Sequence, residues 1–101
     1  MRLFLYGTLV GDRRVGRSVP ATLTGWRRVA LRETRYPTLR RDRGGTVSGA
    51  VVDVPAAVMR RLVAYEGPAY RLARVVVQTA DGNTAAHAWI APGGTRRSWR
   101  N

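Results

Sequence analysis

Short apolar stretches separated by polar ones make up most of this chain, and they predict β-strands. The first is expected at Arg2–Tyr6, where an apolar and aromatic run stops at Gly7. Among the later segments, the first two alternate loosely between apolar and polar residues, and the third is β-branched and alternates more clearly, which is typical of strands. In chain order the later segments are Ala21–Trp26, Arg28–Thr34, Thr46–Val54, Tyr70–Thr79 and Thr84–Ala91.

The connections between these segments also carry local information. Asp81-Gly82, between the last two segments, is the strongest hairpin signal in the sequence. Gly25 predicts a bend or a break between the second and third segments. Arg40–Gly45 is polar and predicts a loop, whereas Gly49 lies inside a strand pattern and predicts a bulge or a close backbone approach.

One segment has the period of a helix. Apolar residues recur at a spacing of three to four after Pro55, which suits the first position of a helix. The pattern ends at Glu66, where Gly67 can provide a left-handed cap and Pro68 a stop. Five or six strands with one late helix predict an α+β fold: a small, mixed, mostly antiparallel β-barrel of about six strands with one main flanking helix.

Composition excludes several kinds of chemistry. The chain has no cysteine, which removes disulfides, thiolate metal sites and cysteine nucleophiles. It has no lysine and only one histidine, His87, so P-loop, Schiff-base and two-histidine chemistry are also excluded. Its aspartates Asp42, Asp53 and Asp81 are isolated, so we expect no metal site. With no internal repeat or linker, residues 1–101 are expected to form a single domain.

The charge is strongly positive. Eighteen arginines against six carboxylates give a formal net charge of +12. Such an excess suggests nucleic acid or another anionic partner, but the arginines are spread along the chain in pairs. We therefore favour solvated surface arginines and keep an arginine-rich nucleic-acid-binding module as an alternative. The chain has neither a signal-peptide pattern nor the run of about 18 apolar residues of a membrane span, so we expect a cytoplasmic protein that does not bind membranes.

Glu66 is the first candidate for chemistry. A carboxylate at the C-terminal end of a helix lies in partial negative charge, which is expected to raise its pKa, and apolar neighbours would act in the same direction. A group of this kind can serve as a general acid or base. A nearby arginine would lower the pKa instead, and a surface glutamate paired with Arg60 or Arg71 is the structural alternative.

The second candidate is the segment that follows the first strand, Tyr6-Gly7-Thr8-Leu9. Gly7 permits a close approach of a ligand to the backbone, and the amides after it could form a nest for a carboxylate or an oxyanion. A glycine after a strand is also a common turn, so this segment alone does not distinguish the two interpretations.

Taken together, these segments resemble the γ-glutamylcyclotransferase-like, or AIG2-like, family. The resemblance rests on Leu3–Leu9, Arg35–Leu39, the strand Val47–Val54 and above all Ala64–Arg71, and it covers about residues 2–91. The family fold that it implies is a small mixed β-barrel with a flanking helix. The ordered set of motifs is more specific than any one of them.

The resemblance also implies an activity and a site. Family members cyclise γ-glutamyl amines or amides, releasing 5-oxoproline and an amine or amino acid, without a cofactor. The acid/base residue would be Glu66, and the substrate-binding residues would be Tyr6, Gly7, Thr8, Leu9, Tyr70 and Tyr36. The leaving group stays open, and a barrel that binds a ligand without turnover is a further alternative. We expect a monomer or a weak dimer.

Overall fold

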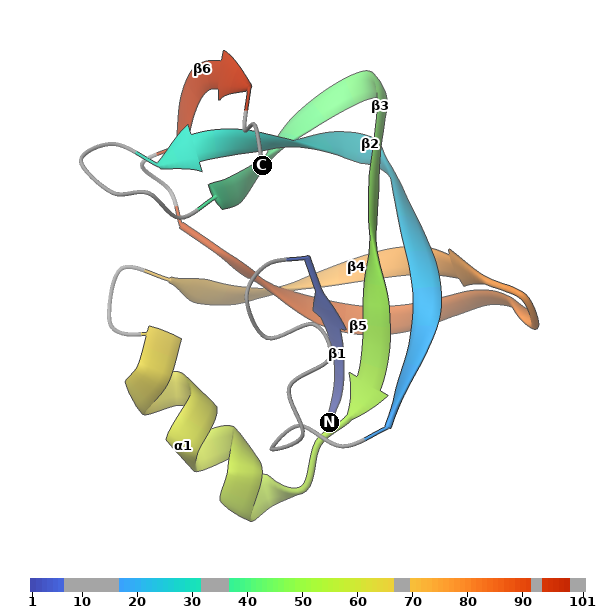
Figure 1. The fold of residues 1–101 in the computed structure, drawn as a ribbon, viewed down its shortest axis with the longest axis vertical. Helices are drawn as coiled ribbons and strands as arrows, with labels where there is room; N and C mark the ends of the chain where they lie inside the picture. The colour runs from blue at the N-terminus through green and yellow to red at the C-terminus, as the bar shows by residue number, and fades with distance from the viewer. Residues whose placement is uncertain (7–16, 32–36, 67–69, 92–93, 99–101) are drawn as a thin grey trace.

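The computed structural model describes residues 1–6, 17–31, 37–66, 70–91 and 94–98, which form six strands and one helix (Figure 1). In chain order these elements are β1 (Arg2–Leu5), β2 (Ser18–Leu31), β3 (Pro37–Asp53), α1 (Ala56–Glu66), β4 (Arg71–Thr79), β5 (Gly82–Ile90) and β6 (Gly94–Ser98). The helix follows the strand that ends at Asp53, as the sequence predicted, but three strands precede it instead of four, because the two segments expected around Gly25 form one strand.

Five of the strands close into a ring. The sheet order is β3-β1-β5-β4-β2-β6, and an additional pairing of β3 with β2 closes the barrel. The pairing of β1 with β5 is parallel, at Leu3 and His87, and the other pairings are antiparallel. β6 lies outside the ring and pairs with the C-terminal part of β2. The mixed, mostly antiparallel barrel is therefore confirmed, with five strands in the ring and a sixth added to it.

The strands differ from the expected ones in one region. The segments on either side of Gly25 form one long strand, β2, whose pairing with β3 shifts between Thr24 and Trp26. Thr24 pairs with Thr46 and Trp26 with Arg41, so the intervening residues of β3 form an irregularity within a paired strand. The predicted loop at Arg40–Gly45 is thus part of β3, because regular pairing with β2 on both sides holds it in the sheet.

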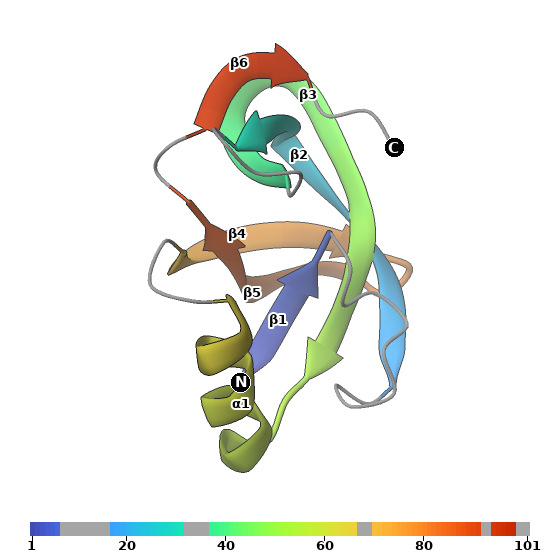
Figure 2. The same cartoon turned by 60° about the vertical axis from the view of Figure 1, so that its left-hand side comes forward.

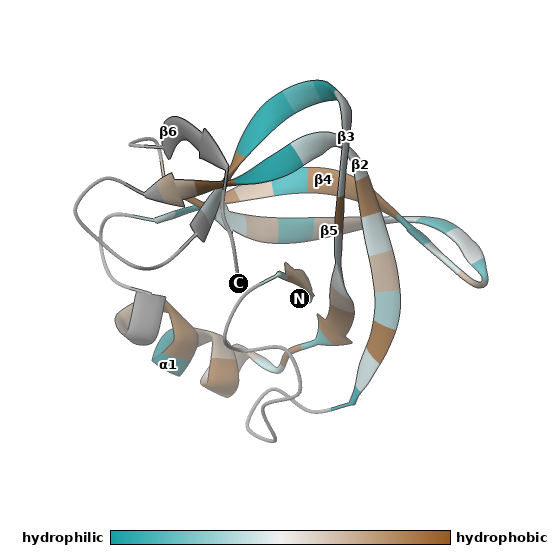
Figure 3. Ribbon diagram, turned by 45° about the horizontal axis from the view of Figure 1, so that its top comes forward, coloured by the Kyte–Doolittle hydropathy of each residue, from teal (hydrophilic) through white to brown (hydrophobic). Residues whose placement is uncertain are grey.

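Alternating side chains build two apolar clusters on the two faces of the sheet. The inner cluster fills the barrel and includes Phe4, Leu23, Leu39, Val51 and Val77. The outer cluster lies between the barrel and α1 and consists of Leu3, Leu5, Val52, Val54, Leu62 and Trp89. Figure 3 shows the alternation as bands along β2. The alternation of side chains along the strands therefore provides both the apolar interior of the barrel and the apolar outer surface on which α1 packs.

The start of α1 is fixed by backbone contacts. The carbonyl of Pro55 accepts hydrogen bonds from the amides of Val58 (3.0 Å) and Met59 (2.9 Å), so Pro55 caps the helix and does not occupy its first turn. One residue earlier, the Val54 amide donates to the Met1 carbonyl, and the Met1 ammonium donates to the Val54 carbonyl, both at 2.8 Å. These bonds continue the β1–β3 ladder up to the helix. The described helix is too short and too polar to cross a membrane.

Candidate functional site

The C-terminal ends of β1 and α1 lie at the same end of the molecule. Figures 1 and 2, two views turned by 60°, both show the strand and the helix running toward this end. Leu62 of α1 packs in the same cluster as Leu3 and Leu5 of β1, which fixes the helix against the strand. The backbone of Glu66, the last residue of α1, is thereby placed toward the end of the barrel where the chain leaves β1.

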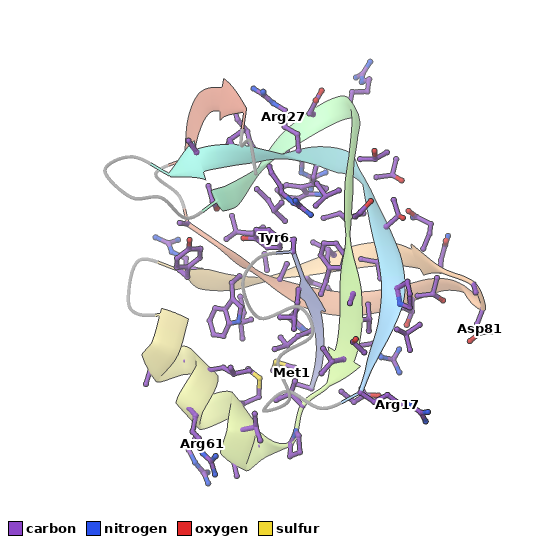
Figure 4. The ribbon with its side chains drawn as sticks, viewed as in Figure 1. Met1, Tyr6, Arg17, Arg27, Arg61 and Asp81 are labelled. Atoms are coloured by element: carbon purple, nitrogen blue, oxygen red, sulfur yellow. The ribbon has the colours of Figure 1, made fainter. Side chains whose placement is uncertain are left out.

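Tyr6 closes the interior of the barrel at this end. Its side chain is buried and stacks near Phe4, with ring centroids 6.2 Å apart, and Figure 4 shows it within the ring of strands. The phenolic hydroxyl donates a hydrogen bond to the backbone carbonyl of Trp89. Tyr6 therefore joins the end of β1 to the end of β5, and this contact fixes the point from which the segment Gly7–Leu9 departs.

Tyr70 lies at the same end, directly before β4. Its side chain is half-buried and packs against the outer cluster that contains Leu62 and Trp89. The two tyrosines are therefore connected through Trp89, since Tyr6 binds its backbone carbonyl and Tyr70 packs on the cluster that includes its indole. The indole Nε1 of Trp89 is buried and finds no hydrogen-bond partner among the residues that the structure describes.

Thr38 is a residue of this end that sequence reasoning did not single out. It is fully buried, and its hydroxyl oxygen accepts a hydrogen bond from the Ala91 amide at 2.8 Å and donates one to the Ala91 carbonyl at 3.3 Å. These bonds attach the start of β3 to the end of β5. The only sequence signal was the inclusion of Thr38 in the segment Arg35–Leu39 that carried the family resemblance.

Within the described residues, Tyr6 and Tyr70 are linked through Trp89. The backbone of Glu66 ends α1 on the side of the molecule toward which β1 runs. The side chain of Glu66, and the expected site residues Gly7, Thr8, Leu9 and Tyr36, lie outside the described part of the chain. Their roles stay predictions. Within the described residues, no three histidine, aspartate or glutamate side chains gather into a group that could hold a metal ion.

Positive charge dominates the electrostatics. Two ion pairs join described residues, Arg2–Asp53 at 3.6 Å and Arg27–Asp42 at 3.9 Å, and all four side chains are substantially exposed. Exposed pairs of this kind contribute little to stability. Because the chain carries only six carboxylates against eighteen arginines, the molecule should attract anionic small molecules.

The comparison with protein-family models identifies one family. The family model described as "Gamma-glutamyl cyclotransferase, AIG2-like" matches residues 3–100. No curated protein matches the chain.

Solved structures show the same fold. An Arabidopsis thaliana protein solved in solution is 24% identical, with 99% of this chain and 74% of that chain covered and a TM-score of 0.78. A second Arabidopsis thaliana protein solved in solution is 25% identical, with 89% and 61% covered and a TM-score of 0.74. A structure described as a gamma-glutamyl cyclotransferase is 17% identical, with 94% and 68% covered and a TM-score of 0.79. The chain therefore spans only part of the length of each of these proteins.

Proposed function

The chain belongs to the AIG2-like gamma-glutamyl cyclotransferase family, and from this premise we propose that it cyclises γ-glutamyl amines or amides. The products would be 5-oxoproline and a free amine or amino acid. The observation that carries the proposal is the family match over residues 3–100. The links of Tyr6 and Tyr70 to Trp89, near the end of β5, are compatible with it.

The reaction needs an internal nucleophile and one group that exchanges protons. The α-amino nitrogen of the substrate attacks its own γ-carbonyl carbon, so a new C–N bond closes the five-membered ring while the bond to the leaving nitrogen breaks. Holding the two atoms together in the folded substrate supplies much of the rate enhancement. In this proposal Glu66 takes a proton from the α-ammonium and later gives one to the leaving nitrogen.

The remaining proposed residues bind and orient the substrate. Amides of the segment Gly7–Leu9 would donate hydrogen bonds to the substrate carboxylate or to the oxyanion that forms at the γ-carbonyl. Tyr6 anchors the start of this segment through its bond to the Trp89 carbonyl. Tyr70 and Tyr36 would line the pocket. The leaving group of the substrate stays open. A monomeric or weakly dimeric state stays a prediction, and binding of nucleic acid stays an alternative.

The test is the substitution Glu66→Gln, measured as 5-oxoproline released from a panel of γ-glutamyl amines and γ-glutamyl dipeptides. We expect a loss of about 10²- to 10⁴-fold in kcat, the usual share of general acid–base catalysis. Glu33→Gln is the matched control, because Glu33 is the other glutamate of the chain and should leave the rate unchanged.

Three outcomes separate the hypotheses. Equal rates for Glu66→Gln and the parent protein would remove Glu66 from the mechanism. A parent protein that binds 5-oxoproline but releases none from any substrate would be a ligand-binding barrel without turnover. A parent protein that neither binds nor releases 5-oxoproline would contradict the proposed function as a whole.

A further inference from the structure

Arg28 is a charged residue on the inward face of β2. It pairs with Leu39 of β3, and directly paired residues of antiparallel strands project from the same face of the sheet. Leu39 is buried in the inner cluster, and Trp26, two residues before Arg28 on the same face, packs against that cluster. The side chain of Arg28 is therefore directed to the inside of the barrel and is half-buried there.

The guanidinium of Arg28 is held beyond the C-terminal end of β1. Its Nη2 donates a hydrogen bond to the backbone carbonyl of Ser48 at 2.5 Å. The ladder between β1 and β3 ends at the pair of Leu5 with Ala50. Ser48 precedes Ala50 by two residues in β3. Because the two strands are antiparallel, Ser48 lies beyond the C-terminal end of β1. The guanidinium is thus anchored at the end of the barrel where Tyr6 leaves β1 and the proposed substrate-binding segment begins.

This guanidinium has no anionic partner among the described residues. Its Nε is buried and has no hydrogen-bond partner in the described part of the chain, and the Ser48 carbonyl takes one of the five N–H groups that an arginine carries. The described carboxylates near β2 and β1 are engaged elsewhere, Asp42 with Arg27 and Asp53 with Arg2. A partly buried cation without a counter-charge is unfavourable, so a ligand anion at this place would be favoured.

We propose that Arg28 binds the α-carboxylate of the γ-glutamyl group. This inference rests on the proposed function and adds a specificity-determining residue to it. The planar guanidinium is well suited to carboxylates, and every γ-glutamyl substrate carries the α-carboxylate and retains it in 5-oxoproline. Fixing that carboxylate at the end of β1 also orients the neighbouring α-amino group for attack on the γ-carbonyl.

The test is ligand binding, which does not require turnover. Two probes are titrated by NMR: 5-oxoproline, and 2-pyrrolidone, which has the same ring without the carboxylate. Arg28→Met is expected to weaken 5-oxoproline binding by roughly 10- to 100-fold, the range for hydrogen bonds to a charged group, and to leave 2-pyrrolidone binding unchanged. Arg28→Lys should retain part of the affinity, because it keeps the charge but loses the planar pair of donors.

Arg27→Met is the matched control. Arg27 is the neighbouring residue of β2, its side chain projects from the opposite face, and Figure 4 shows it at the outer edge of the barrel. The substitution removes the same charge from the same strand and should leave binding of 5-oxoproline unchanged. Thermal unfolding of each variant shows whether a loss of binding comes from a loss of fold.

The outcomes distinguish this inference from the proposed function. Unchanged 5-oxoproline binding in Arg28→Met, with turnover in the parent protein, overturns the role of Arg28 alone. If Arg28→Met lost turnover only with γ-glutamyl dipeptides, whose leaving amino acid carries its own carboxylate, the guanidinium would bind the leaving group. That result would also overturn the proposed role of Arg28. Binding that depends on Arg28 in a parent without turnover would support the inference and reject the enzyme. A parent that does not bind 5-oxoproline rejects both.

Discussion

The hydroxyl of Thr38 serves both backbone groups of Ala91, accepting from the amide at 2.8 Å and donating to the carbonyl at 3.3 Å. Both residues are buried. A side chain thus takes the place that a neighbouring strand would have in a regular ladder. This contact joins the start of β3 to the end of β5, where Tyr6 also binds the backbone carbonyl of Trp89.

Thr38→Val is expected to destabilise the fold by about 2 kcal/mol or more. Valine has nearly the same shape as threonine but leaves the amide and carbonyl of Ala91 buried without partners, and each such group costs about 1–3 kcal/mol. Thr38→Ser keeps the hydroxyl and loses one methyl group, so it should cost only about 1 kcal/mol. Urea unfolding of the three proteins measures the difference. A valine variant as stable as the serine variant would show that the hydroxyl contributes little.

Gly49→Ala is expected to disrupt the pairing of β1 with β3. A Cβ at this position would collide with the carbonyl oxygen of Leu5 and would lie 2.9 Å from two ring atoms of Phe4, which is fully buried. Overpacking of this kind costs about 1–3 kcal/mol, and more where a backbone atom must move. The close approach that the sequence suggested at Gly49 is confirmed by these contacts.

Gly44→Ala is the control for that measurement. A Cβ at Gly44 meets nothing within 4 Å, and its backbone does not have a positive φ. We expect the variant to be within about 0.5 kcal/mol of the parent or slightly more stable, because alanine restricts the unfolded chain. If thermal unfolding gave equal losses for both alanine variants, the steric explanation for Gly49 would be wrong.

Gly25→Ala is expected to cost about 1–2 kcal/mol, the penalty for a side chain in left-handed backbone. Gly25 has a φ of +89°, and a Cβ there would meet nothing within 4 Å, so the cost comes from the backbone alone. Gly25→Asn should cost less, because asparagine tolerates this conformation. Circular dichroism melting curves give the order of the three proteins. Alanine equal to or better than asparagine would contradict the assignment of the cost to φ.

Gly25 also changes which residues of β2 face inward. Before it, Ala21 and Leu23 belong to the inner cluster, whereas after it Trp26 packs against that cluster. The register shift between Thr24 and Trp26 accounts for the change from odd to even positions. Arg28 lies on the inward face for this reason, and a strict alternation continued from Leu23 would have placed it outside.

The sequence by itself determined the elements whose signals are local. The helix period after Pro55, the hairpin at Asp81-Gly82 and the alternation of the strands depend on neighbouring residues, and each agrees with the structure. The order of these elements and the motifs around Leu3–Leu9 and Ala64–Arg71 also identified the family, which the match over residues 3–100 confirms. Two local expectations were wrong. Pro55 caps the helix instead of beginning it, and Arg40–Gly45 lies within β3 instead of forming a loop.

Only the tertiary structure decided which segments pair and which faces they present. β6 is polar and lacks an alternating pattern of its own, yet it forms a strand because β2 offers it an unpaired edge. The merging of two predicted strands into β2, the contact of Thr38 with Ala91 and the inward position of Arg28 likewise depend on register between distant residues. A local pattern carries no information on that register, since it is fixed by partners that lie far away in the chain.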